Sequence, residues 1–161
     1  MRIAVALAAV IALSGCDGGA SDDTPEARGD ASGGEYRQTF DLGDGNDAEV
    51  RAGGNIDVQL PAGFTVYPGA EVVTTMSASS ADGEGRTTMM TTNDDPADVI
   101  AFYRKQAEAA GFAIANEMDS GTARMISGQS ADGTGLNVIV GTGEDGTTIS
   151  LSIGKAGSSG N

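Results

Sequence analysis

The sequence predicts an α+β domain in which an antiparallel sheet of about six strands carries one helix on one of its faces. Three observations support this fold class. Apolar and polar residues alternate with a period of two through much of residues 35–153, which is typical of half-buried strands. Asp-Gly and related turn sequences separate these segments at short intervals, as in a series of hairpins. One segment only, residues 96–110, has apolar residues at helical spacing.

The domain opens with a polar, glycine-rich segment. Short strands are expected at residues 36–42, 49–52 and 56–60. Gly53-Gly54 between the last two of them is a hairpin signal. The proline-containing connection 60–70 then supplies side chains that cap one side of the core, namely Phe64, Val66 and Tyr67.

The later strands have a clearer pattern. Residues 71–79 and 86–92 are rich in Thr, Val and Met and are predicted to form a hairpin. Four further strands are expected after the helix, at residues 112–117, 122–129, 136–142 and 147–153. The last strand alternates Ile149, Leu151 and Ile153 with Thr and Ser, so one of its faces is expected to be buried.

The helix at residues 96–110 has a start and a stop signal. Asp95 is expected to cap its N-terminus, with Pro96 at the first helical position. Gly111 is expected to end it. Its mainly apolar stripe comprises Val99, Phe102, Tyr103, Gln106, Ala107 and Ala110.

Composition excludes several classes of function. The 161 residues contain 9 Lys and Arg against 23 Asp and Glu, with a net charge of -14, which argues against a nucleic-acid partner. There is no His and one Cys, so imidazole catalysis, an internal disulfide and a thiolate cluster are excluded. No cofactor and no catalytic residue are predicted.

Residues 1–15 are predicted to be a signal peptide. Arg2 precedes an apolar run from Ile3 to Leu13. As a helix this run is about 16 Å long at 1.5 Å per residue, whereas a membrane span needs about 30 Å. The segment is therefore too short to remain as a transmembrane helix.

The end of this run, Leu13-Ser14-Gly15-Cys16, resembles the lipobox of bacterial lipoproteins. The resemblance implies cleavage between Gly15 and Cys16 and attachment of lipid to the Cys16 thiol. Several acyl chains, at about 0.8 kcal/mol per buried CH₂, would anchor the protein stably in a membrane. The alternative is an ordinary secretory signal in which the only Cys falls at this position by chance.

The mature chain divides into three parts. Residues 16–34 hold the Cys and an acidic segment without large apolar side chains, predicted to be a disordered tether. Residues 35–153 form the single domain, in which 35–60 has the weakest pattern. Residues 154–161 are predicted to be a flexible tail.

One acidic segment is a candidate metal site. Its carboxylates are Asp41, Asp44, Asp47 and Glu49, and carboxylate oxygens are the ligands that calcium prefers. The spacing fits neither an EF-hand loop nor a repeated calcium-binding motif. An acidic turn without a metal is the alternative interpretation.

Several local features, Tyr67-Pro68-Gly69-Ala70, Phe102-Tyr103 in the helix and Gly111-Phe112 at its end, resemble small uncharacterised domains of bacterial envelope lipoproteins. The resemblance covers residues 60–153 and implies no catalytic residues. We therefore expect a lipid-anchored envelope protein with a small binding or assembly domain that is not an enzyme. Its partners would be the membrane and another envelope protein, docked at a sheet edge. The alternative is a periplasm-facing lipoprotein that binds a solute or calcium. The sequence does not distinguish inner from outer membrane.

Overall fold

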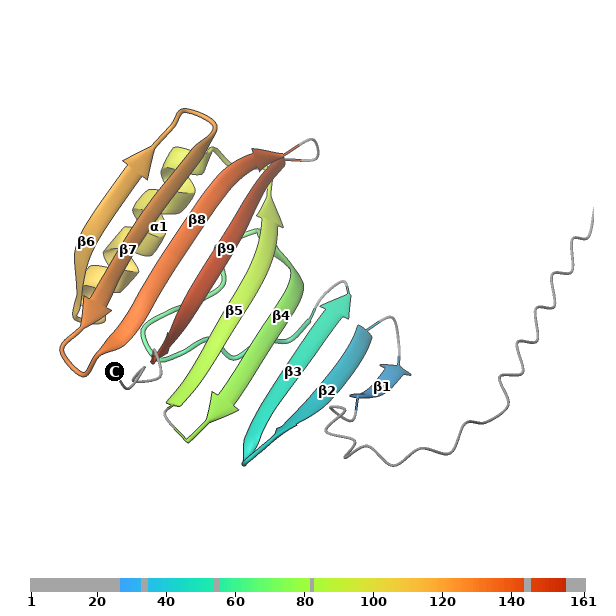
Figure 1. Cartoon of the computed structure of the whole chain (residues 1–161). Coiled ribbons are helices and arrows are strands. Elements are labelled where there is room, and N and C mark those ends of the chain that lie inside the picture. The colour runs from blue at the N-terminus through green and yellow to red at the C-terminus, as the bar shows by residue number, and fades with distance from the viewer. Residues whose placement is uncertain (1–26, 33–34, 54–55, 82, 144–145, 156–161) are drawn as a thin grey trace, which may run out of the picture.

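A single antiparallel sheet dominates the fold (Figure 1). The computed structural model describes residues 27–32, 35–53, 56–81, 83–143 and 146–155. The strands are β1 (Ala27–Ser32), β2 (Glu35–Gly43), β3 (Asn46–Gly53), β4 (Glu71–Ser80), β5 (Gly83–Thr92), β6 (Phe112–Asp119), β7 (Ala123–Ser130), β8 (Thr134–Gly143) and β9 (Gly146–Lys155). The only helix among the described residues is α1 (Pro96–Ala109).

The sheet consists of two meanders that meet in its middle. The strand order is β1-β2-β3-β4-β5-β9-β8-β7-β6, and all neighbours are antiparallel. Strands β1 to β5 follow one another from one edge of the sheet to its middle. The chain then crosses through α1 to the opposite edge, where β6 lies. Strands β7, β8 and β9 return to the middle, so that β9 pairs with β5. The edge strands are therefore β1 and β6.

The prediction of about six strands was wrong, because the described sheet has nine. The strands expected after residue 70 are present, and so are those expected at 36–42 and 49–52, as β2 and β3. Together with β1, these polar strands of the front of the chain join the same sheet. Strand β3 pairs with β4, for example Glu49 with Ser77. Backbone hydrogen bonds hold such pairs whatever the side chains are, so low apolar content did not prevent pairing. The result is a sheet-dominated fold.

Three segments differ from their predicted structure. Residues 27–32, in the expected tether, form β1 and pair with β2. Residues 56–60, expected to be a strand, are a connection without strand pairing. Strand β9 continues to Lys155, two residues into the expected tail. Residues 16–26, 33–34 and 156–161 lie outside the described residues.

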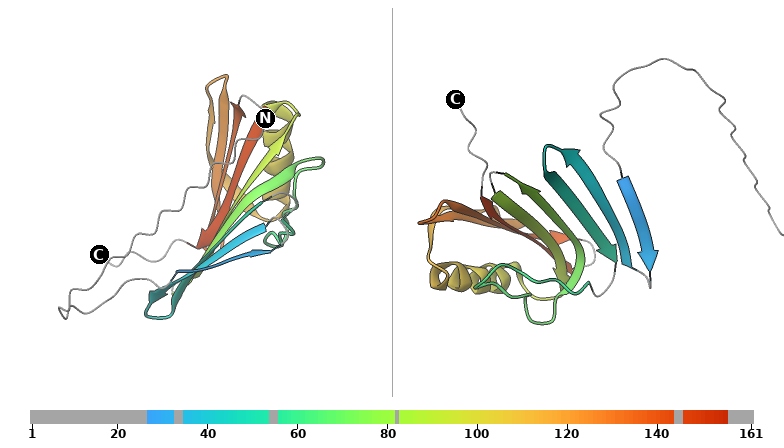
Figure 2. Two further views of the ribbon diagram at one scale, coloured as in Figure 1. Left: turned by 90° about the vertical axis from the view of Figure 1, so that its right-hand side faces the viewer. Right: turned by 90° about the horizontal axis from the view of Figure 1, so that it is seen from below.

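Helix α1 forms where its signals predict. Asp95 caps it by accepting a hydrogen bond from the backbone N–H of Ala97 at 2.7 Å. Gly111 follows with a φ of +83°, a conformation that glycine adopts without strain. The helix packs on β6, β7 and β8, so it covers only one end of the sheet (Figure 2). We call this face of the sheet the helix side and the opposite face the outer face.

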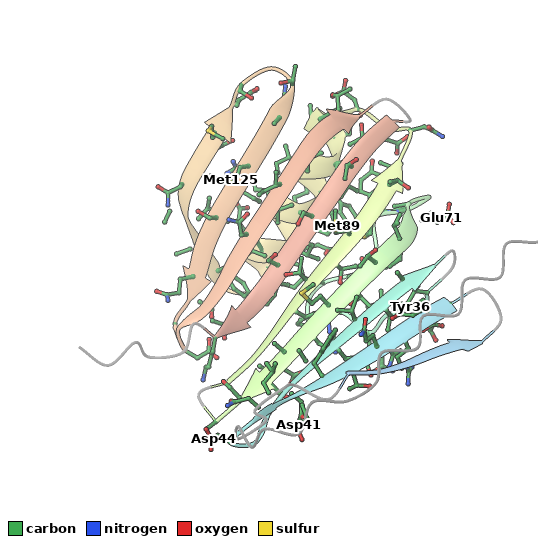
Figure 3. All side chains as sticks on the ribbon, turned by 45° about the vertical axis from the view of Figure 1, so that its right-hand side comes forward. Tyr36, Asp41, Asp44, Glu71, Met89 and Met125 are labelled. Atoms are coloured by element: carbon green, nitrogen blue, oxygen red, sulfur yellow. The ribbon has the colours of Figure 1, made fainter. Side chains whose placement is uncertain are left out.

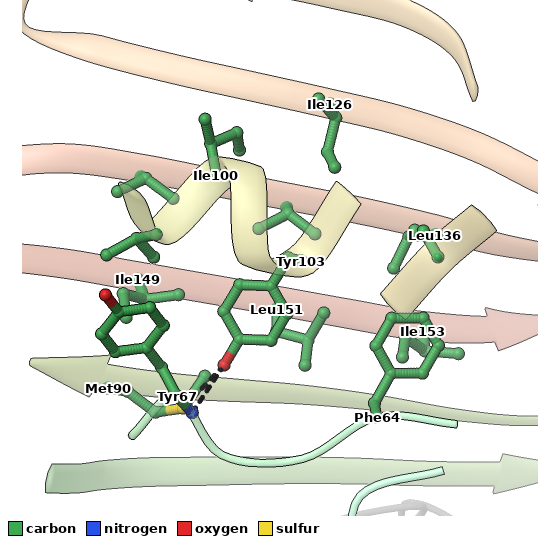
Figure 4. Packing of buried hydrophobic residues seen from close by; sticks show 14 of the residues in the cluster. Phe64, Tyr67, Met90, Ile100, Tyr103, Ile126, Leu136, Ile149, Leu151 and Ile153 are labelled. Atoms are coloured by element: carbon green, nitrogen blue, oxygen red, sulfur yellow. Dashed lines mark hydrogen bonds between the residues drawn. The ribbon is translucent and has the colours of Figure 1, made fainter. Parts of the chain in front are cut away.

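The hydrophobic core lies between α1, the connection 56–70 and the helix side of the sheet (Figure 4). Tyr103 is fully buried. Its hydroxyl accepts a hydrogen bond from the backbone N–H of Tyr67 at 3.1 Å and donates one to the sulfur of Met90 at 3.5 Å. Burial raises the pKa of Tyr103 to about 12. The hydroxyl therefore fastens the connection to the helix.

Candidate functional site

The helix side of the sheet changes from apolar to charged along a single row of cross-strand partners. Starting under the helix, the row reads Ile126, Val138, Leu151, Thr88, Thr75, Arg51 and Arg37. Side chains directly opposite each other on neighbouring strands share a face. The row therefore places two arginines on the same face as the core, beyond the region that α1 covers.

The connection between β3 and β4 crosses this charged region and is fastened to it. The guanidinium of Arg86, on β5, donates a hydrogen bond to the backbone carbonyl of Gln59. Arg86 also lies 3.8 Å from a carboxylate oxygen of Glu84. The contact between Arg86 and Gln59 holds the connection above the sheet, and both residues line two cavities there.

The first cavity, which we call the charged cavity, has a volume of about 340 Å³. The sheet contributes its floor through β3, β4 and β5, and the connection contributes the rest. Its lining residues are Glu49, Arg51, Asp57, Val58, Gln59, Thr75, Ser77 and Arg86. It therefore presents two guanidinium groups, two carboxylates, two hydroxyls and an amide.

Ion pairs hold the charged side chains of this cavity in position. The Nε of Arg51 donates to a carboxylate oxygen of Glu49 at 2.6 Å, and the Nε of Arg37 lies 3.9 Å from the other oxygen. Arg51 and Glu49 side chains are each 29% exposed, so the pair is partly shielded from water. Arg51 and Arg86 have further N–H donors besides those in these contacts. These donors are what a bound acidic group would use.

The second cavity is less polar and has a volume of about 430 Å³. Leu60, Pro61 and Ile153 line it together with Arg86 and Lys155. It shares Gln59 and Arg86 with the charged cavity. The two cavities are thus neighbours that share the contact between Arg86 and Gln59.

A buried hydroxyl lies next to the charged cavity. Thr88 is fully buried, and its Oγ1 is the one buried side-chain polar atom without a hydrogen-bond partner in the described part of the chain. Its cross-strand partner Thr75 lines the charged cavity. A buried hydroxyl without a partner costs about 1–3 kcal/mol, and such groups are uncommon in folded proteins.

The four predicted calcium ligands are not gathered into one site. Asp41 and Asp47 are cross-strand partners at the end of the β2–β3 hairpin. One oxygen of Asp41 accepts from the backbone N–H of Gly43 at 2.9 Å, and Asp44 lies in the turn with a φ of +52°. Glu49 pairs with arginines instead. Across the described ranges, no three side chains of Asp, Glu, Cys or His gather closely enough to hold a metal ion.

Of the residues that line the charged cavity, only Glu49 was a candidate from the sequence, as a calcium ligand, and the others were missed. A signal was present, since Glu49 and Arg51, Thr75 and Ser77, and Arg86 and Thr88 are each two residues apart. A period of two places each pair on one face of a strand. The alternation does not show which strands pair with one another. The predicted lipidation site at Gly15 and Cys16 lies outside the described residues.

Comparison with known proteins gives one family. No helix among the described residues is both long and apolar enough to cross a membrane. No curated protein and no solved structure is similar enough to the chain to count as a match. The START domain-like family matches residues 72–153, just over half of the 161 residues. The match runs from β4 to β9 and includes α1, the floor of both cavities on β5 and most of the core, so the chain belongs to the START domain-like family.

Proposed function

We propose that this chain is a lipid-anchored binding protein of the bacterial cell envelope, and that its domain holds a small polar ligand in the charged cavity. The observation that carries the proposal is the cavity itself: a space of about 340 Å³ lined by Glu49 and Arg51 on β3, Arg86 on β5 and Asp57 in the connection, so that charges of both signs border it. START-like domains are typically binding domains, which is consistent with a role in binding and not in catalysis.

The chemistry of the lining indicates the class of ligand. Two guanidinium groups attract a carboxylate and can bind it through paired hydrogen bonds. Glu49 and Asp57 attract an ammonium group, and Thr75 and Ser77 supply hydroxyls. A small zwitterion, such as a free amino acid, carries both charges at a separation that such a cavity accommodates. An uncharged apolar ligand would displace water from these polar groups and leave them without partners, which is unfavourable.

The anchor is the second part of the proposal. It rests on the lipobox-like Leu13-Ser14-Gly15-Cys16 and the apolar run before it. A lipid on Cys16 would keep the domain at the membrane surface, facing the periplasm or the exterior. A binding domain held there would meet solutes that enter the envelope.

Binding is tested on the full-length chain, purified in detergent, by thermal melting with each of the free amino acids in turn. A ligand at a hundred times its dissociation constant stabilises the folded state by about 2.7 kcal/mol. We expect at least one amino acid to raise the melting temperature. The absence of a shift with all of them at millimolar concentration would contradict the proposed ligand class.

A cavity-filling variant locates the site. Ser77→Phe places a ring in the charged cavity, and it should abolish the ligand-dependent shift. Lys105→Phe, on the exposed side of α1, is the matched control and should keep the full shift. Equal shifts in the two variants would show that the ligand binds elsewhere.

A further inference from the structure

The two faces of the sheet differ sharply in charge. Strands β2 to β9 contain thirteen charged residues, and twelve of them lie on the helix side by their position in the register. The exception is Glu71, at the end of β4 before the irregular pairing at Val72 and Thr74. The outer face therefore carries almost no charge in a protein whose net charge is -14.

Large apolar side chains occupy the outer face instead (Figure 3). One row of cross-strand partners runs across six strands, through Met118, Met125, Ile139, Ser150, Met89 and Thr74. Ile139 is 44% exposed and Met89 is 43% exposed, and Met76 lies two positions beyond Thr74 at 50%. Helix α1 lies on the other side of the sheet (Figure 1), so no described helix covers these side chains.

This surface is unlike an ordinary solvated sheet face. Exposed faces of antiparallel sheets are usually polar and charged, and a contiguous apolar patch on a soluble surface marks an interaction site. The remaining outer-face residues of β5 to β9 are Ser, Thr, Asn, Gln, Ala and Gly, which are small or uncharged, and β2 and β3 add the uncharged side chains of Tyr36, Phe40, Leu42 and Val50. Such a face has no attraction for anionic lipid head groups, because it carries no Lys or Arg.

The charge distribution identifies the occupant as a second copy of the chain. In a two-fold symmetric interface, each side chain near the axis meets its own counterpart. A charged residue there would meet a like charge, whereas Ser, Thr, Asn and Gln can each donate to and accept from their own kind. The outer face satisfies this condition across its width. The charged side chains of two copies would lie on the far sides of two sheets stacked about 10 Å apart, beyond the screening length of about 8 Å.

The area also fits a stable dimer. The outer face from β2 to β6 spans eight strands, which at about 4.8 Å spacing gives a width of about 34 Å. Strands of eight residues at about 3.3 Å each are about 26 Å long. The product, about 880 Å² per copy, is close to the roughly 800 Å² per partner of a standard interface.

We propose that two copies of this chain pack outer face to outer face, with the row from Met118 to Met89 at the centre of the interface. The sheets would stack with their strands about 30° apart, as in a sandwich of two aligned sheets. The charged cavities lie on the helix side and stay open in this dimer. The proposal is independent of the ligand-binding function, and either can fail without the other.

Crosslinking in native membranes tests the interface. Ser150→Cys places a thiol in the middle of the outer face, on β9, and Ala101→Cys places one on the exposed side of α1. With a short bis-maleimide, Ser150→Cys should give a dimer band at least ten times stronger than Ala101→Cys. The wild-type chain reports any background from Cys16. Equal bands would overturn the proposal, as would a Ser150→Cys thiol that is protected from maleimide without forming a dimer.

Charge substitution separates the interface from a folding defect. Ile139→Glu and Ile139→Lys, each combined with Ser150→Cys, should reduce the dimer band at least tenfold. In either variant the interface would bury the new charge and bring it close to the same charge on the second copy. Co-expression of the two variants should restore the band, since opposite charges then face each other across the interface. Each variant should keep a cooperative thermal transition. A dimer band unaffected by both single substitutions would contradict the proposed interface.

Discussion

Tyr103 shows how much a single buried polar atom holds together. Its ring lies in the core between α1 and β5, while its hydroxyl is the partner of a backbone N–H in the connection between β3 and β4. Phe102 beside it packs edge-to-face on Tyr67, with ring centroids 5.1 Å apart. The same connection forms part of the wall of both cavities. Tyr103 therefore links the packing of the core to the position of the connection that lines both cavities.

Tyr103→Phe should destabilise the fold by about 1–3 kcal/mol, because it leaves the buried N–H of Tyr67 without a partner. The free energy of unfolding in urea measures this change. Tyr36→Phe is the matched control, since the Tyr36 hydroxyl is exposed and donates only to the side chain of Gln38 at 2.9 Å. An equal effect of the two substitutions would mean that the Tyr103 hydrogen bond contributes nothing measurable.

Asp132 gives the protein a pH dependence at the acid end. Hydrogen bonds from Ser130 and Thr134 lower the pKa of this exposed carboxyl from 3.8 to about 2. Because the folded-state pKa is depressed, the stabilisation is present above pH 3.8 and is lost as the pH falls toward 2. Asp132→Asn should remove this part of the pH dependence. The difference in melting temperature between wild type and variant, followed from pH 5 to pH 2, should shrink on acidification.

Ser130→Ala provides the control for this assignment. It removes the largest cause of the lowered pKa but keeps the carboxylate. The pH range over which the folded state loses this stabilisation should become narrower, because its lower limit rises from about 2 toward 3.8. A profile identical to that of the wild type would contradict the assigned cause.

At the scale of elements, the junction of β5 and β9 is the place where the two meanders become one sheet. Gly85 and Gly154 face each other there, and Gly135 on β8 is the next partner along the row. A Cβ on Gly154 would lie 2.6 Å from the Cα of Gly85, which is too close for any real contact. A Cβ on Gly135 would meet only the carbonyl oxygen of Gly154, at 3.5 Å.

Gly154→Ala should therefore push β9 away from β5 and destabilise the fold by about 1–3 kcal/mol, as overpacked sites do. Gly135→Ala lies one strand away on the same face and should change the unfolding free energy by much less. Urea unfolding of both variants tests the prediction. A larger loss in Gly135→Ala than in Gly154→Ala would show that the junction tolerates a wider strand spacing.

At the scale of the whole molecule, the chain has two distinct surfaces and a predicted membrane attachment. The charged cavity opens on the helix side, and the uncharged outer face lies on the other side of the sheet. The predicted attachment at Cys16 precedes β1, an edge strand. Ligand binding, dimer formation and anchoring would thus use separate parts of the chain.

Cys16→Ser should release the protein from membranes, because the thiol that would carry the lipid is gone. In a detergent phase separation, the wild-type chain should enter the detergent phase and the variant the aqueous phase. Ser14→Ala, which keeps a small residue at that position, is the control and should behave like the wild type. A Cys16→Ser chain that stays in the detergent phase would contradict the anchor.

The sequence by itself determined the features that depend only on residues close to one another along the chain. Asp95, Pro96 and Gly111 predict the helix bounds to within one residue, and alternation in Ile149, Leu151 and Ile153 predicts a strand with one buried face. These signals are local, since a cap or a period of two involves residues only a few positions apart. The sequence also predicts the anchor at Cys16, which stays a prediction.

Only the tertiary structure decided which strands pair beyond the predicted hairpins. The pairing of Arg51 with Thr75, and of Thr88 with Leu151, brings together strands that no short turn connects. Alternation shows which residues share a face within one strand, but it does not show which face meets that of another strand. That choice depends on register between distant segments. For this reason the nine-stranded sheet, the charged cavity and the uncharged outer face emerged from the fold and not from the pattern.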